Sequence, residues 1–292
     1  MGVIYNTQNV DESYSAIIEP NLYYKSVLIP GMTFTDKYIA QTGGIYVHKL
    51  GGGKDTGVVP GTPGRDFSNE VVADSLIQMV FNNNFQKSRK IYGVTSKNVT
   101  YNKVEAEMAE AIKQVGQGWQ TSGVAAMVNE GALSSDTEAI TSTNFKEKMI
   151  ALRKELVDKG SNADYAIVST NVFEAYLKYT GTEYTPSTND TVLTGLRNVN
   201  FLGMTLIEAN LLNQSTAKYY DYTGTLKTID LTKVDVIMGE AEAFSALNNF
   251  ETARAIDSEN FAGMLAQVET NAAYRVTNPD RIIVKKNVAP SA

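Results

Sequence analysis

One histidine and no cysteine are present in the 292 residues, which leaves few side chains for nucleophilic catalysis or metal binding. His48 lies beside a glycine-rich run, and a single histidine without a thiol partner cannot build a site of the usual nitrogen and sulfur ligands. A Ser-His-Asp triad is formally possible, but the Gly-x-Ser-x-Gly motif is absent. We therefore interpret His48 as an exposed loop residue and predict no catalytic and no metal-binding residue.

The run from Gly51 to Lys54 is similar to part of a phosphate-binding loop. That loop needs a glycine five positions before its Gly-Lys pair and Ser or Thr after it, and those positions hold His48 and Asp55. No Gly-x-Gly-x-x-Gly run leads from a strand into a helix. The run is typical of a flexible loop, and the sequence predicts no cofactor.

Acidic residues at short spacing are the remaining chemical candidates. They could pair for acid–base catalysis, but charged residues at helical or loop spacing are far more often solvated faces of the fold. The two groups are Glu105, Glu107 and Glu110, and Glu240 and Glu242. We predict that the protein is not an enzyme.

Composition is that of an ordinary globular protein, with 43% hydrophobic and 20% charged residues. The net charge of -6 and the absence of any cluster of Lys and Arg argue against tight binding of nucleic acid. No apolar run approaches the roughly 18 residues of a membrane span, and no secretory signal is evident. The sequence predicts a soluble, unsecreted protein in a reducing compartment.

Turn-forming residues divide the first quarter of the chain. Residues 1–35 are mostly polar without helical period and predict an extended arm. A strand-like run over 38–50 precedes dense Gly and Pro over 51–64, so residues 36–68 are expected to form a long projecting hairpin. Residues 71–81 fit either a capped helix or a buried strand.

Apolar periodicity predicts the remaining elements. A long amphipathic helix is expected over 102–128, with a stripe formed by Tyr101, Val104, Met108, Ile112, Val115 and Trp119. A second helix is expected over 144–159, ending at Gly160. Asn171 and Glu174 fit a reciprocal N-terminal cap of a third helix. Strands are expected over 85–92, 165–168, 199–209 (a pair turning at Gly203), 234–238, 263–276 and 282–284.

The order of these elements resembles the major capsid protein of tailed bacteriophages, of the Hong Kong 97 type. Residues 164–177 (DYAIVSTNVFEAYL) are similar to the strand and helix of the family's axial lobe, and 202–210 (LGMTLIEAN) to the glycine-turn strand that follows. Residues 238–244 (MGEAEAF) and 273–284 (AYRVTNPDRIIV) are similar to its later segments. The resemblance covers most of the chain, and the shared order carries it.

This resemblance implies an α+β fold with an arm (1–35), an extended loop (36–68), a peripheral domain (69–133 and 266–292, with the spine helix over 102–128) and an axial domain (134–265). The protein would function through its interfaces. Hexamers and pentamers would assemble in the bacterial cytoplasm and close into an icosahedral head. The head would enclose DNA without binding it tightly. Many family members begin with a helical scaffolding segment, whereas this chain begins almost at once with the arm, so either a separate scaffolding protein or a processed form is expected here, together with a portal. Residues of the extended loop are candidates for intersubunit contact: Tyr46, Val47, Lys49, Lys54, Arg65 and Phe67. Two alternatives stay open, an encapsulin-type shell around cargo enzymes and an α+β enzyme with an unrecognised site.

Overall fold

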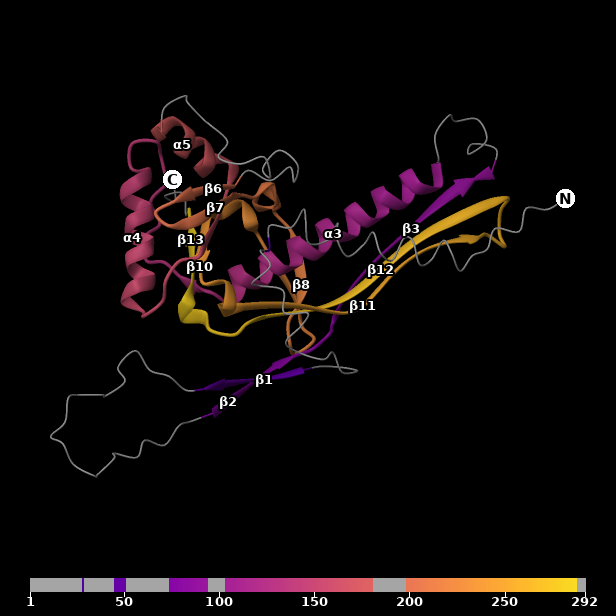
Figure 1. Cartoon of the computed structure of the whole chain (residues 1–292), viewed down its shortest axis with the longest axis horizontal. Helices are drawn as coiled ribbons and strands as arrows, with labels where there is room; N and C mark the ends of the chain where they lie inside the picture. Colours follow the sequence, from indigo (N-terminus) through magenta and orange to yellow (C-terminus); the bar gives the residue numbers. More distant parts are fainter. Residues whose placement is uncertain (1–27, 29–44, 51–73, 94–102, 181–197, 288–292) are drawn as a thin grey trace.

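Two β-sheets joined by one long helix form the body of the protein (Figure 1). The computed structural model describes residues 28, 45–50, 74–93, 103–180 and 198–287. Its helices are α3 (Lys103–Glu130), α4 (Phe145–Asp158) and α5 (Thr170–Thr180). Helix α3 runs from the three-stranded sheet to the six-stranded sheet, so its two halves belong to different parts of the core.

The larger sheet has six strands in the order β4-β13-β10-β5-β7-β6. Its strands are β4 (Ala132–Leu133), β5 (Tyr165–Val168), β6 (Asn198–Phe201), β7 (Met204–Glu208), β10 (Val234–Gly239) and β13 (Ile282–Lys286). The pairs β5–β7 and β13–β4 are parallel, and the other pairs are antiparallel. The central strands are therefore assembled from segments that are distant in the sequence.

Alternating side chains divide this sheet between two hydrophobic cores. Ile167, Ile237 and Val284 face the C-terminal half of α3, whereas their neighbours Val168, Met238 and Ile283 pack with α4 and α5. Because both faces are covered, β5 and β10 are apolar at nearly every position. This explains why 165–168 and 234–238 could be recognised as short buried strands.

The second sheet consists of three long antiparallel strands in the order β11-β12-β3. They are β3 (Asn83–Tyr92), β11 (Phe244–Asp257) and β12 (Gly263–Val276). Helix α3 covers one face, where Met108, Ile112 and Val115 pack against small residues such as Ala255 and Ala266. The predicted helical face is confirmed for these residues, although Tyr101 lies outside the described part of the chain.

Two small two-stranded ladders complete the described fold. β1 (Ile45–Leu50) pairs with β2 (Asp74–Met79), so the ambiguous run over 71–81 contains a strand. β8 (Ala217–Tyr220) pairs with β9 (Leu226–Ile229), a hairpin that was not predicted. β1 is a strand and contains His48, so the interpretation of His48 as a loop residue was wrong. The residues between β1 and β2 lie outside the described ranges.

Helix ends and turns follow the predicted residues with one exception. Gly160 has a φ of +79° directly after α4, and its neighbour Ser161 donates its N–H to the carbonyl of Leu156, as a C-terminal glycine stop requires. Gly203 has a φ of +80° in the turn between β6 and β7. However, α5 begins at Thr170, and the Ser169 hydroxyl accepts the N–H of Val172. The Asn171 cap was therefore placed two residues too late.

Strand pairing crosses the domain boundaries drawn from the sequence. β11 lies within residues 134–265 yet pairs with β12 and shares the sheet of β3. β13 lies within residues 266–292 yet pairs with β10, which lies within residues 134–265. The division into arm, loop, peripheral and axial domains stays a prediction.

A lysine without any exposed surface fixes the loop between β4 and α4. Lys285 of β13 donates to the carbonyl oxygens of Asp136 and Glu138, and its Nζ lies 3.8 Å from a carboxylate oxygen of Asp235. Asp235 stands at the irregularity in the pairing of β10 with β13. Burial raises the pKa of Asp235, and the positive charge of Lys285 opposes that rise. The loop is thus held to the sheet by a buried polar cluster.

Candidate intersubunit surfaces

The predicted contact residues divide between a described strand and residues outside the structural description. Tyr46, Val47 and Lys49 lie in β1, paired with Gln78, Ile77 and Ser75 of β2. Lys54, Arg65 and Phe67 fall between the two strands, outside the described part. The β1–β2 ladder begins at the three-stranded sheet, where Met79 packs with Leu247 and Ala273, and extends away from it (Figure 1). A two-stranded ladder is at best marginally stable by itself, so this projection is suited to a partner, and the contact role of these six residues stays a prediction.

Asparagine side chains fasten the base of this projection to the β8–β9 hairpin. Asn83, which is almost fully buried, donates its amide to the carbonyl of Tyr220 (3.0 Å) and accepts the N–H of Tyr220 (2.8 Å). Asn82 donates to the carbonyl of Asp221 at 2.9 Å. The Asn83 side chain thus pairs with β8 as the backbone of a neighbouring strand would, at the point where the chain passes from β2 into β3.

Replacing Asn83 tests this connection. Asn83→Ala removes both hydrogen bonds to Tyr220 and should lower the free energy of unfolding by about 1–3 kcal/mol. Urea unfolding followed by the fluorescence of Trp119, the single tryptophan, measures the loss. Asn84→Ala is the matched control, because Asn84 is exposed and donates its amide to Glu269, and its loss should cost less than about 0.5 kcal/mol. Equal losses in the two variants would contradict the role of Asn83.

The β8–β9 hairpin has a well-organised turn and an exposed apolar outer side. One carboxylate oxygen of Asp221 accepts the N–H groups of Thr223 and Thr225, each at 2.9 Å, and Gly224 takes a φ of +78°. Burial alone would raise the pKa of Asp221, but these hydrogen bonds outweigh it and lower the pKa. Large apolar side chains are exposed on the same hairpin: Tyr220, Tyr222 and Leu226.

A buried carboxylate joins α3, β12 and this hairpin. Glu130, the last residue of α3, accepts the N–H of Val276 (2.9 Å), lies 3.4 Å from the guanidinium of Arg275 and contacts the Tyr219 hydroxyl (3.5 Å). Arg275 in turn stacks on the ring of Tyr222, 3.9 Å from its centre. Burial raises the pKa of Glu130 despite the hydrogen bond from Val276 and the charge of Arg275.

The raised pKa of Glu130 predicts a pH-dependent stability difference. The folded state binds this proton more tightly than the unfolded chain, so the contribution is present below about pH 4.5 and is lost as the pH rises through the folded-state pKa. Glu130→Gln cannot titrate. Its unfolding free energy, relative to the unchanged protein, should therefore increase between about pH 4 and pH 7.5 in urea titrations. A difference that stays constant or falls over this range would contradict the assignment.

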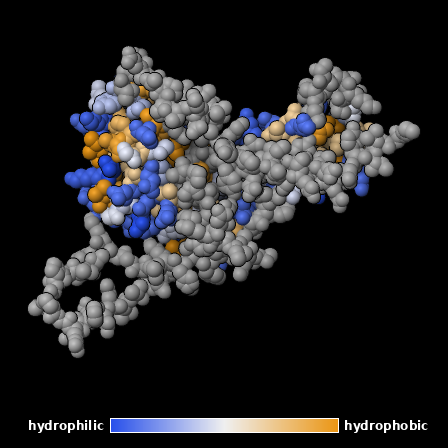
Figure 2. All heavy atoms as spheres, in the orientation of Figure 1, coloured by the Kyte–Doolittle hydropathy of each residue, from blue (hydrophilic) through white to orange (hydrophobic). Residues whose placement is uncertain are grey.

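A further group of exposed apolar side chains lies beside the six-stranded sheet. Ile150 and Val157 are seven residues apart on the outer face of α4, and Leu133 is 62% exposed in the edge strand β4. Ser134, next to Leu133, bonds to Glu155 of α4 and keeps the edge strand close to the helix. Figure 2 shows apolar patches within the mostly hydrophilic surface over α4. These residues were not among the predicted contacts, and their exposure is decided only by the fold.

The carboxylates considered for catalysis are distributed over separate contacts. Glu107 pairs with Arg89, Glu110 accepts from Gln114, and Glu240 pairs with Arg281 at 2.7 Å. In the described ranges no group of three or more Asp, Glu or His residues could hold a metal ion. No helix in the described chain is long and apolar enough to cross a membrane. The prediction that the protein is not an enzyme stays a prediction.

Comparisons of the fold identify similar assembled shells. The sequence matches no protein-family profile and no curated protein. The mature capsid of bacteriophage PhiM1 matches 100% of this chain and 90% of that chain, with a TM-score of 0.59 and 13% identity. The capsid structure of cyanophage P-SCSP1u matches 86% of this chain and 85% of that chain, with a TM-score of 0.62 and 10% identity. The chain has the fold of tailed-phage major capsid proteins.

This capsid fold confirms the predicted α+β class and the resemblance to the Hong Kong 97 type. A virus-like particle from Pyrococcus furiosus shares it, with a TM-score of 0.57, 12% identity, and 94% of this chain and 98% of that chain covered. At identities of 10–13% the likeness is one of fold. The match covers 86–100% of this chain, so the surfaces described above lie in the part that shares the capsid fold.

Proposed function

We propose that this protein is the major capsid protein of a phage head. Copies assemble into hexamers and pentamers that close into an icosahedral shell around double-stranded DNA. The observation that carries the proposal is the match over the full chain to a mature phage capsid subunit. The protein acts through its interfaces rather than through catalysis or a cofactor, is located in the virion and is assembled in the cytoplasm of the bacterial host.

The described surfaces support such a role. The projecting β1–β2 ladder, the exposed side of the β8–β9 hairpin and the apolar residues around α4 are separate faces of one subunit, as a subunit with several neighbours requires. The net charge of -6 is consistent with a wall that does not bind phosphates tightly, which leaves enclosed DNA free to exit. Scaffolding and portal proteins are the further partners of this proposal.

Electron microscopy of the purified protein tests the proposal, with and without a scaffolding protein coexpressed from the same source. Closed shells or isolated capsomers of five and six subunits are expected in micrographs and in analytical sedimentation. A small oligomer of defined mass under every condition, without rings or shells, would contradict the proposal and favour an enzyme.

An encapsulin-type shell is the second candidate, supported by the match to the virus-like particle from Pyrococcus furiosus. The contents of purified particles distinguish the two. Nuclease-protected DNA in particles isolated from producing cells supports the phage head. A protein cargo in stoichiometric amounts, with no protected DNA, supports the encapsulin-type shell.

A further inference from the structure

The C-terminal half of α3 is buried on every side. All ten residues from Trp119 to Val128 are buried, whereas the N-terminal half buries only one stripe. A helix that is buried all round needs partners around its whole circumference. These partners include Tyr274 of β12 and Ile237 and Val284 of the six-stranded sheet. On β8, the Lys218 carbonyl oxygen accepts a hydrogen bond from the Ser122 hydroxyl.

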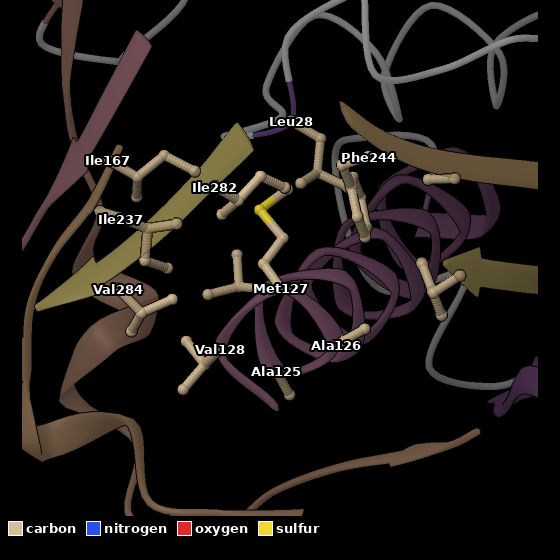
Figure 3. Packing of buried hydrophobic residues seen from close by; sticks show 14 of the residues in the cluster. Leu28, Ala125, Ala126, Met127, Val128, Ile167, Ile237, Phe244, Ile282 and Val284 are labelled. Carbon is tan, nitrogen blue, oxygen red and sulfur yellow. The ribbon is translucent and has the colours of Figure 1, made fainter. Parts of the chain in front are cut away.

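Leu28 covers the side of α3 on which Gly123 lies. It is 2% exposed and belongs to the same hydrophobic cluster as Met127, Phe244 and Ile282. Figure 3 shows its side chain directed into this cluster between the helix and the neighbouring strands. Within residues 1–44, Leu28 is the position that the structure describes, and it connects the N-terminal segment to the centre of the fold.

Gly123 leaves the space that Leu28 occupies. A Cβ atom at position 123 would lie 2.9 Å from Cδ1 of Leu28 and 3.2 Å from Cε1 of Tyr274. Tyr274 has little freedom to move, because its buried hydroxyl donates to the carbonyl of Trp119 at 2.7 Å. A side chain at 123 would therefore displace Leu28 rather than Tyr274.

We infer that Gly123, Met127, Phe244, Tyr274 and Ile282 form a docking socket for the N-terminal segment of the same chain, and that Leu28 is the side chain that binds it. The 17 positions from Leu28 to Ile45 can span roughly 55 Å when extended, which permits the same chain to continue into β1. The socket determines whether residues 1–44 are attached to the body of the subunit. This inference does not depend on the proposed function.

Limited proteolysis of the full chain measures this attachment. Lys25 and Lys37 flank Leu28 in the sequence, so trypsin cleavage at either site reports how often the segment leaves the socket. Leu28→Ala removes most of the docked side chain and should accelerate cleavage at these lysines about tenfold or more. Tyr92→Ala is the control, because it shortens a side chain that is 53% exposed and lies in none of the candidate intersubunit surfaces, and it should leave the cleavage rate unchanged.

Gly123→Ala provides the sharper test, because alanine normally stabilises a helix relative to glycine. The inference predicts the opposite direction: the added methyl group displaces Leu28 and accelerates cleavage at Lys25 and Lys37. In the Leu28→Ala background the same methyl group has space, so Gly123→Ala should cause no further acceleration.

Three outcomes would overturn the inference. The first is slower cleavage in Gly123→Ala, as helix propensity alone dictates. The second is an additive acceleration by the two substitutions, which would mean that they act at independent places. Protection of the lysines that disappears on dilution of the unchanged protein would assign the socket to the N-terminal segment of a second copy instead.

Discussion

Ile112→Asp should prevent the protein from folding to a soluble state. Ile112 is 3% exposed at the contact of α3 with β3 and β12, in a cluster of apolar residues that includes Met108 and Ala266. Burying an unpaired carboxylate there should cost about 4 kcal/mol or more, a large part of a typical total stability of about 5–15 kcal/mol. Soluble yield and far-ultraviolet circular dichroism measure the loss.

The control for Ile112→Asp is Gln117→Asp, which adds the same carboxylate to an exposed position of the same helix. Gln117→Asp should change the unfolding free energy by less than about 0.5 kcal/mol. An Ile112→Asp protein that is soluble and unfolds at the same urea concentration as the unchanged protein would show that the buried face of α3 has been misassigned.

Removing the residues between β1 and β2 should abolish shell closure and leave the subunit folded. Leu50 pairs with Asp74, so an Asn-Gly turn in place of residues 51–73 can join the two strands without changing their register. The described residues of the apolar clusters of both larger sheets come from other segments of the chain, so Tm should change by less than about 3 °C. A contact repeated at every subunit is decisive through multiplicity, so sedimentation should show monomers or isolated capsomers.

A second variant tests whether shell closure depends on the length of this segment or on its side chains. Replacing residues 51–73 by a Gly-Ser linker of equal length preserves the covalent path but removes every specific contact, and it should also fail to close shells. Closed shells of normal size from the Asn-Gly variant would show that the segment is not an intersubunit clamp. A variant that does not fold would place the segment in the core of its own subunit.

Buried polar groups connect the separate parts of the subunit, and apolar contacts alone would not specify these connections. Asn83 fixes the base of the projection to the β8–β9 hairpin, Glu130 joins that hairpin to α3 and β12, and Lys285 holds the loop before α4. Leaving any of these groups without hydrogen-bond partners would cost free energy. Each group therefore favours the one relative placement of the elements around it in which its hydrogen bonds form. Such connections suit a subunit that must present several surfaces in a fixed geometry.

Sequence by itself determined the elements whose apolar residues follow a regular period. The stripe containing Met108, Ile112 and Val115 predicted α3, and the uninterrupted apolar run over 165–168 predicted β5, because these patterns depend only on which faces are buried. Gly160 and Gly203 were recognised because positive φ angles favour glycine. The order of the elements, with segments such as 164–177, resembled the tailed-phage major capsid protein, and the comparisons confirm the resemblance of fold.

Tertiary structure decided the parts that depend on partners distant in the chain. β11 was not predicted because its inward-facing residues include the small Ala253 and Ala255, which give a weak alternating pattern and are buried only because α3 lies above them. The sheet to which β13 belongs depends on its pairing with β10, and the role of Gly123 depends on Leu28, 95 positions earlier. No local pattern encodes a partner so far away in sequence, since the free energy of such contacts arises only when the chain brings both surfaces together.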